Sequence, residues 1–283
     1  MHSFEDNINK YRENTYRSRP ELRVASINQA VDFINSRGFA FFWPIKDHPL
    51  PSLWVAKSGD RPVPNNHDDP GHIIWQWKDS LMNQRRWYYG KILRKKATII
   101  SFSLLPNFYA LSPNYGAYPH DFLEQYQQGM LSAEAKSIYE SLLIEGPLDV
   151  ISLRAKARLS SKENKYRFNK AIDTLQSEMK ICPVGICPKG RFQYSYIMDI
   201  PARYYPDLIV QAKNITEINA AKNILSKYLS SLGGINISSI IKIFKWEKPF
   251  TKKVIEELLS ENKDFSMVEN EKGEDFIILN HLI

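Results

Sequence analysis

The side chains best suited to chemistry gather in residues 75–96, WQWKDSLMNQRRWYYGKILRKK. A single carboxylate, Asp79, lies there among seven cations: Lys78, Arg85, Arg86, Lys91, Arg94, Lys95 and Lys96. Five aromatic residues lie among these charges: Trp75, Trp77, Trp87, Tyr88 and Tyr89. Cations neutralise phosphate groups and rings stack on bases, so the stretch predicts a nucleic-acid surface. The alternative is a solvated face that happens to be basic, and at least one of the three tryptophans is expected to be wholly structural.

Carboxylates that could take part in a reaction are few near this stretch. Asp79 is either an internal partner of Lys78 or Arg85, or a carboxylate held in a cationic aromatic pocket where a base or sugar could meet it. Upstream, the motif HDDPGH in residues 67–72 holds two histidines and two aspartates, the residue types of a metal site. We favour a simple turn at Asp69-Pro70-Gly71 and expect no bound metal.

The composition is that of a globular protein with room for two or three compact units. Of its 283 residues, 43% are hydrophobic and 24% are charged. Two cysteines, Cys182 and Cys187, are too few for a disulfide framework. The first 20 residues carry charges throughout, which is not typical of a secretory signal, and the apolar runs are shorter than the about 20 residues that cross a bilayer. We therefore expect a cytoplasmic protein that does not enter a membrane.

An amphipathic helix is predicted over residues 22–37 and is expected to end at Gly38. Its apolar stripe consists of Val24, Ile27, Val31 and Ile34. The aromatic run GFAFFWPIK follows at once and is broken by Pro44. A long polar loop then leads to the basic stretch, and loops of this length in a compact domain tend to be functional or disordered.

A unit with one order of elements appears twice, from near residue 138 and from near residue 224. Each copy begins with an amphipathic helix ending at Gly146 or Gly233, where glycine is expected to supply a left-handed cap. A short extended piece and a short helix follow, and Ser152 or Ser238 is expected to cap that helix. A longer helix comes next, and two strand-like runs then flank a turn containing Lys-Gly, which predicts a hairpin.

Three helices followed by a β-hairpin is the winged-helix plan. The sequence therefore predicts an α+β fold of tandem winged-helix units packed into one compact chain. We expect a polar segment over residues 1–20, a winged-helix-like domain over 21–130, a middle winged helix over 131–205 and a C-terminal one over 206–283. Winged helices also serve as protein-interaction modules, so this plan alone does not establish DNA binding.

The chain resembles the AlkZ-like winged-helix DNA glycosylases, and is most similar to a shorter branch described as AlkZ-related. The resemblance covers most of residues 20–280 and is carried by RGFAFF, SLLIEGPLDV, FQYSYIMDIPARYYPD and YLSSLGGINISSIIKIFKW. It implies binding of duplex DNA with a damaged base. It also implies cleavage of the N-glycosidic bond of alkylated or crosslinked nucleobases, without metal or cofactor.

The chain departs from this family at the residues that hold the attacking water. Family enzymes carry Gln-aliphatic-Gln or Gln-aliphatic-Asp just after the first helix, and the matching positions here are Phe41 and Trp43. Neither side chain can accept a proton. Either another carboxylate replaces the motif, with Asp47, Asp69 and Asp79 as candidates, or the protein binds DNA without cutting. We expect the short segment between Asp69 and Asp79 to bring these two acids to one site.

The remaining expected contacts follow from the resemblance and the charge pattern. A base pocket is expected from Phe41, Trp43, Lys46 and Trp77. Contacts to nucleic acid are expected from Lys78, Arg85, Arg86, Trp87, Tyr88, Lys91, Arg94, Lys95 and Lys96, and from Lys189 and Arg191 of the middle hairpin. The preferred hypothesis is a monomeric DNA glycosylase. The alternatives are a non-catalytic DNA-binding protein, regulatory or damage-sensing, and a metal-dependent nuclease built on HDDPGH.

Overall fold

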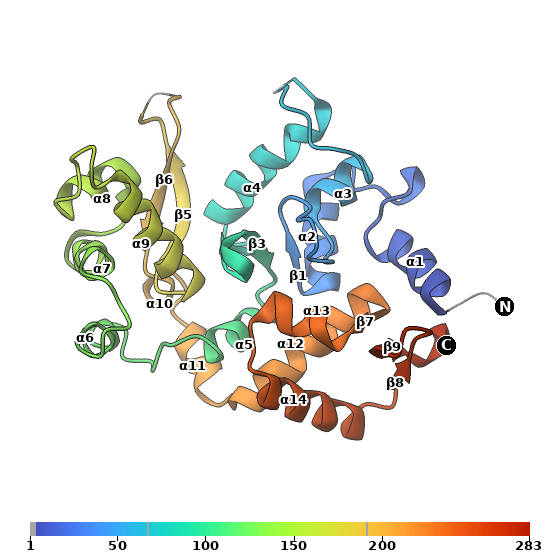
Figure 1. The fold of residues 1–283 in the computed structure, drawn as a ribbon. Helices are drawn as coiled ribbons and strands as arrows, with labels where there is room; N and C mark the ends of the chain where they lie inside the picture. The colour runs from blue at the N-terminus through green and yellow to red at the C-terminus, as the bar shows by residue number, and fades with distance from the viewer. Residues whose placement is uncertain (1–3, 67, 191) are drawn as a thin grey trace.

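Three small antiparallel sheets, each with its own helices, make up an α+β fold (Figure 1). The computed structural model describes residues 4–66, 68–190 and 192–283. Each sheet has three strands, with the orders β1-β3-β2, β4-β6-β5 and β7-β9-β8. In all three sheets the central strand is the last of the three in the chain, and its two partners lie on either side of a helical segment in the sequence.

The N-terminal part places its sheet beside three helices. Its elements are α2 (Ile27–Arg37), β1 (Phe39–Phe41), α3 (Leu53–Ser58), α4 (Ile73–Asn83), β2 (Tyr88–Lys91) and β3 (Ala97–Ile100). Helix α2 starts later than the predicted residue 22, because the Ser26 side chain accepts a hydrogen bond from the Gln29 N–H and fixes the first turn there. Its end at Gly38 is confirmed, and the φ of 79° at that residue suits glycine.

The order of elements predicted for the two repeated units is found in both. The first copy contains α7 (Ala133–Glu145), β4 (Leu148–Asp149), α8 (Val150–Lys156), α9 (Lys165–Ser177), β5 (Cys182–Cys187) and β6 (Ser195–Asp199). The second contains α12 (Glu217–Leu232), β7 (Gly234–Asn236), α13 (Ile237–Phe244), α14 (Lys248–Glu261), β8 (Phe265–Glu269) and β9 (Asp275–Leu279). Both predicted hairpins are confirmed, since β5 pairs with β6 and β8 pairs with β9 in antiparallel register.

The caps of the short helices differ from those predicted. The last residues of the short strands, Asp149 and Asn236, accept the backbone N–H groups at the starts of α8 and α13. Ser152 and Ser238 lie inside those helices instead. A side-chain oxygen directly before the first turn reaches the unpaired N–H groups, which a residue already within the turn does not. The expected left-handed cap is found at Gly233, with φ 78°, whereas Gly146 has φ −62°.

Asp149 is also paired with the cation Lys189 across the unit. The Lys189 Nζ lies 2.6 Å from Oδ2 of Asp149. Burial raises the pKa of Asp149, but hydrogen bonds from Lys189 and Ser152 outweigh it and lower the pKa to about 2. Because the folded pKa lies below the unfolded one, this group stabilises the fold above about pH 4, and the contribution is lost as the pH falls toward 2.

Asp149→Ala should lower the free energy of unfolding by about 1–2 kcal/mol at pH 7, since a cap and its ion pair are both lost. The deficit relative to the parent protein should shrink below about pH 3. Urea unfolding at pH 7 and below about pH 3 measures the deficit in unfolding free energy under both conditions. Ser238→Ala is the control and should stay within about 0.5 kcal/mol of the parent. A deficit of the same size at both pH values would contradict the assigned ion pair.

The first residues of the chain form a helix, α1 (Phe4–Thr15), which the sequence pattern did not indicate. It docks against the C-terminal part, beside β7–β9 (Figure 1). The Tyr11 hydroxyl donates to the Ser230 carbonyl at 2.8 Å, and Arg12 Nη2 donates to the Gly234 carbonyl at 2.7 Å. These bonds satisfy carbonyl groups near the end of α12 that have no partner within that helix.

The buried hydrophobic side chains form three clusters: one shared between parts of the chain, one within the N-terminal part and one within the middle part. Phe39, Phe41 and Tyr88 from the first sheet pack in one cluster with Tyr228 of α12. The middle part has a separate cluster centred on Leu142 and other residues of α7 and α9. Short helices connect the parts: α5 (Leu105–Ala110), α6 (Asp121–Gln127), α10 (Pro201–Tyr204) and α11 (Leu208–Lys213). Among the described residues, no helix is both long enough and apolar enough to cross a membrane.

Candidate active site and nucleic-acid surface

A buried lysine joins the N-terminal part to the middle part. Lys78 lies on α4, which runs beside the β5–β6 hairpin (Figure 1). Its Nζ donates to Oδ1 of Asp79 at 2.6 Å, to the Tyr194 hydroxyl at 2.8 Å and to the Tyr196 hydroxyl at 2.6 Å. An ammonium group has three N–H donors, so all of them are used by these partners.

Aromatic rings from both parts surround this ammonium. Its Nζ lies 4.6 Å from the ring centroid of Tyr196, 4.8 Å from that of Trp75 and 5.1 Å from that of Tyr89. Burial lowers the pKa of Lys78, and the hydrogen bond and charge of Asp79 oppose that shift. The negative faces of the rings stabilise the buried cation further. The group therefore forms a specific inter-domain contact rather than a solvated charge.

Asp79 is the acid at the edge of this group, and its side chain is 14% exposed. Two donors, Lys78 Nζ and the Tyr194 hydroxyl at 2.9 Å, converge on its Oδ1. Within the described part of the chain, Oδ2 has no hydrogen-bond partner. One carboxylate oxygen is thus held in place, and the other remains available to a water molecule or to a sugar.

Trp43 lies next to this group, whereas Phe41 does not. The half-buried Trp43 ring packs against Trp75 at 5.9 Å and against Trp54 at 5.4 Å. Phe41 is fully buried and belongs to the core shared with α12. The two positions expected to correspond to the glutamine motif therefore lie in different surroundings. The expectation that Phe41 lines a base pocket is wrong for this structure, because no part of its ring is accessible.

Asp69 has a structural role that the turn interpretation predicted. It begins the short helix η2 (Pro70–His72), accepting the Gly71 N–H at 2.8 Å. Both of its oxygens also accept from Arg61, at 2.6 and 3.0 Å. The hydrogen bond from Arg61 and then that from Gly71 lower the pKa of Asp69.

The predicted meeting of Asp69 and Asp79 does not occur. Helix α4 begins at Ile73, and six residues of helix place Asp79 about 9 Å further along the axis. The two carboxylates also have different partners, Arg61 for one and Lys78 with Tyr194 for the other.

The structure gives no support to Asp47 as a reacting carboxylate or to HDDPGH as a metal site. Asp47, with φ 61°, and Lys46 are exposed in a turn, and their neighbour His48 lines a different cavity against α1. His67 of HDDPGH lies outside the described residues. Among those that are described, no group of three His, Cys, Asp or Glu side chains could hold a metal ion.

Several rings of the basic stretch belong to the core. Trp87 and Tyr88 are fully buried, so neither can stack on a base in this arrangement, and their expected role in nucleic-acid binding is corrected. The prediction that at least one tryptophan of the stretch is structural is confirmed by Trp87. Trp77 is 9% exposed and packs in the N-terminal core, with Lys57 Nζ 5.4 Å from its ring centroid. Its expected place in a base pocket stays a prediction.

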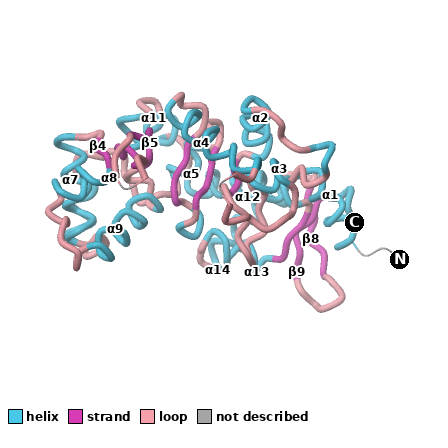
Figure 2. The backbone as a smooth tube through the Cα atoms, turned by 90° about the horizontal axis from the view of Figure 1, so that it is seen from above, coloured by secondary structure: helices cyan, strands magenta, loops and turns pink. Residues whose placement is uncertain are grey.

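The seven cations do not form one surface. Lys78 is buried, and Arg85 stacks its guanidinium 4.3 Å from the centroid of Tyr204. Lys91 pairs with Asp173 of α9 at 2.6 Å, and Lys95 donates to Thr174 of the same helix at 2.9 Å. Seen from above, α9 and α11, the helix that follows Tyr204, lie at opposite edges of one end of the molecule (Figure 2).

The seven cations are spread over several surfaces because of the local structure of residues 75–96. The stretch runs through the end of α4, strand β2 and the short helix η3 (Leu93–Lys95), so successive side chains point in different directions. Arg86 and Lys96 are exposed, and Arg94 is half-buried. Of the two cations predicted on the middle hairpin, Lys189 pairs with Asp149, and Arg191 lies outside the described residues.

Sequence reasoning missed the two tyrosines that complete the site. Tyr194 directly precedes β6 and Tyr196 lies within it. Their spacing of two residues, which places side chains on one face of a strand, was the available signal. They lie more than a hundred positions from Lys78, at separations of 116 and 118 residues. No local pattern relates segments that far apart.

A sequence model of the AlkZ-related family matches residues 24–245, a range that contains Lys78, Asp79 and both tyrosines. The chain belongs to the AlkZ-related family. This result confirms the resemblance seen in the sequence. Among solved structures, this AlkZ-related chain is similar to the Streptomyces sahachiroi DNA glycosylase AlkZ, with a TM-score of 0.62 and 12% sequence identity. The match covers 99% of this chain and 71% of that chain, and it shows a shared fold. A comparison with curated proteins gives no match.

Proposed function

We propose that this protein binds duplex DNA and hydrolyses the N-glycosidic bond of a damaged nucleobase, with Asp79 as the carboxylate of the reaction. The observation that carries the proposal is the geometry of Asp79, with Oδ1 held by Lys78 and Tyr194 and Oδ2 left available. Membership of the AlkZ-related family supports it, as does a fold shared with a protein described as a DNA glycosylase.

The chemistry requires an anion near the sugar. Breaking the bond between base and sugar builds positive charge on the anomeric carbon, which a carboxylate stabilises or quenches by directing a water molecule. Lys78 and Tyr194 would hold Asp79 in one orientation throughout, so little reorganisation is needed in the transition state. Trp75, which is 37% exposed, and the neighbouring Trp43 offer faces on which an extruded base could stack.

The architecture supports DNA binding through winged-helix units. We propose three of them, over residues 21–130, 131–205 and 206–283, because each part has helices followed by a small antiparallel sheet. Helix α9 carries the exposed residues Lys165, Arg167 and Lys170, and a basic helix next to a wing is suited to phosphate contacts.

Arg85→Ala with Arg86→Ala should weaken duplex binding on all sequences alike. The slope of log affinity against log salt should fall by about 2, near one unit for each lost phosphate contact. Lys91→Ala with Lys95→Ala is the matched control, because these cations already contact Asp173 and Thr174, and its slope should change by less than about one unit. Filter binding over a salt series measures both. An unchanged slope in the arginine variant would remove these residues from the DNA surface.

A second function, DNA binding without catalysis, is favoured by one observation. The positions matching the glutamine motif hold Phe41 and Trp43, and neither side chain can activate water. Incubation with alkylated duplex DNA separates the two functions, because a glycosylase leaves abasic sites and a binding protein leaves only a complex.

A further inference from the structure

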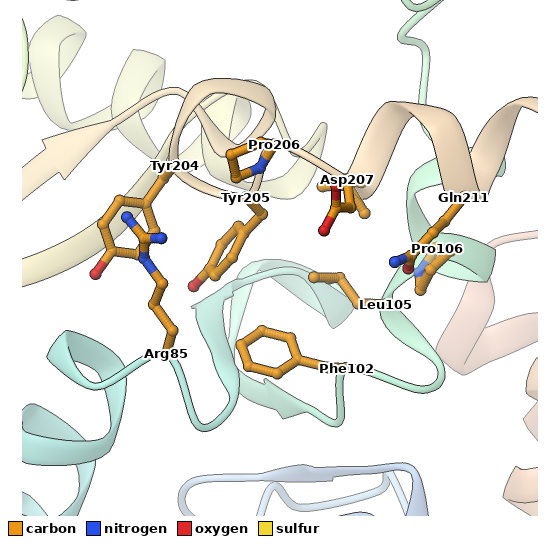
Figure 3. A pocket seen from close by; sticks show the side chains of 10 residues that line it. Arg85, Phe102, Leu105, Pro106, Tyr204, Tyr205, Pro206, Asp207 and Gln211 are labelled. Carbon is orange, nitrogen blue, oxygen red and sulfur yellow. The ribbon is translucent and has the colours of Figure 1, made fainter.

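A cavity of about 300 Å³ lies where the three parts of the chain meet, away from the Asp79 site (Figure 3). Its walls come from the turn after α4, the start of α5 and the segment from α10 to α11. Arg85 forms one rim, with its guanidinium 4.3 Å from the centroid of the Tyr204 ring. A guanidinium already stacked on one ring presents its second flat face to another planar group.

The remaining walls are suited to a flat ring. Phe102 lies on one side and Pro206 on the other, with Tyr205 between them (Figure 3). The rings of Phe102 and Tyr205 meet edge to face at 5.4 Å, which fixes both orientations. Apolar and aromatic walls of this kind bind the faces of a planar ligand, and polar groups at the rim then select its edge.

Two polar side chains line the same cavity without an internal role. Asp207 precedes α11 but makes no side-chain capping bond to it, and Gln211 lies one helical turn further on. Within the described residues, neither side chain has a hydrogen-bond partner. Figure 3 shows the Asp207 carboxylate turned toward the cavity. A carboxylate offers two acceptor oxygens side by side, and it therefore matches a ligand edge with two adjacent N–H donors.

We infer that this cavity binds an unpaired guanine base through Asp207. The N1–H and the exocyclic amino group of guanine are adjacent donors, and they would reach the two oxygens of the carboxylate. Adenine presents an acceptor nitrogen and a C–H at the corresponding positions, so it offers Asp207 no donor pair. Hypoxanthine keeps N1–H but lacks the amino group, and it should rank between the two.

The place of the cavity fits a nucleotide near the reacting one. Arg85 lies two residues beyond the end of α4, the helix that carries Asp79. The neighbouring Arg86 is exposed and could contact a phosphate of the same strand. The inference rests on the proposed DNA binding only for the source of the guanine. Its chemistry can be tested on nucleosides, independently of any base excision.

The test is titration of the purified protein with 2′-deoxyguanosine, 2′-deoxyinosine and 2′-deoxyadenosine, followed by NMR. Deoxyguanosine should bind at least about tenfold more tightly than deoxyadenosine, with deoxyinosine between them. Asp207→Asn should abolish that preference, since an amide presents one acceptor and one donor in place of two acceptors. Asp275→Asn, at an exposed position on β9, is the control and should preserve it.

Equal affinities for deoxyguanosine and deoxyadenosine in the parent protein would overturn the inference. So would a guanine preference that survives in Asp207→Asn. Because no DNA cleavage enters the measurement, a protein without glycosylase activity could still pass it, and an active glycosylase could still fail it.

Discussion

Replacing Asp79 with asparagine should lower the rate of base excision by at least about a hundredfold. Asparagine keeps the size of the side chain and can still accept from Lys78 and Tyr194 through its carbonyl oxygen. It removes the negative charge, however, and places an amide where Oδ2 of the carboxylate had no partner among the described residues. DNA affinity should stay within a few-fold, because loss of an anion cannot weaken contacts to phosphates.

Asp69→Asn is the matched control for this variant. Both residues were candidates from the sequence, but Asp69 is bound by Arg61 and by the Gly71 N–H, at a different place in the fold. Excision by Asp69→Asn should stay within a few-fold of the parent rate. Single-turnover assays on one lesion-containing duplex compare all three proteins. Full activity in Asp79→Asn, or an equal loss in both variants, would remove Asp79 from the reaction centre.

Lys78→Met should lower the free energy of unfolding by about 3 kcal/mol. Methionine fills nearly the same space but cannot donate, so Asp79 and two tyrosine hydroxyls lose a common partner. Removing one member of a buried ion pair leaves the other charge without compensation. The contact also joins two parts of the chain, so its loss should loosen the hairpin against α4.

Lys57→Met provides the comparison for this stability measurement. Lys57 lies over the Trp77 ring at 5.4 Å and is only half-buried, so its loss should cost less than about 1 kcal/mol. The double variant Lys78→Met with Asp79→Asn should recover part of the loss, because no uncompensated charge remains. Urea unfolding followed by tryptophan fluorescence measures all three. Equal stability of the Lys78 and Lys57 variants would contradict the role assigned to the buried ammonium.

The elements that could be predicted from the sequence are those with strong local signals. The two hairpins were predicted because alternating strands flank a turn with Lys-Gly, and this pairing is found. The end of α2 at Gly38 has an equally local cause. Helix α1 escaped prediction because its polar sequence carries only one fully buried apolar residue, Ile8, and its stability comes from hydrogen bonds to distant residues of the C-terminal part.

The candidate site was only partly predictable for a related reason. Asp79 was singled out as the lone acid in a cationic aromatic stretch, and the structure places it among rings and beside a cation. The seven cations were expected on one surface because they are neighbours in sequence. A run that crosses a helix end, a strand and a tight turn places its side chains on several faces of the molecule. One of these cations, Lys78, is buried in the protein interior.

The two positions expected to hold the glutamine motif lie in different surroundings in the folded protein. Phe41 contributes to the core shared by the first sheet and α12, whereas Trp43 stays close to the Asp79 group through Trp75. A protein that replaced a water-binding motif with apolar side chains would need its anion from another element. We propose that helix α4 supplies it through Asp79, whose Oδ1 accepts a hydrogen bond from Tyr194 of the middle part.

The measurement that tests glycosylase function most directly is the formation of abasic sites. Purified protein is incubated with duplex DNA carrying alkylated bases, in the presence of a chelator, and abasic sites are scored by strand cleavage in alkali. The proposal predicts that abasic sites accumulate with the parent protein and with Asp69→Asn, and at no more than about one hundredth of that rate with Asp79→Asn. Tight binding by the parent protein across a broad panel of lesions, without any abasic product, would contradict it and leave DNA binding as the function.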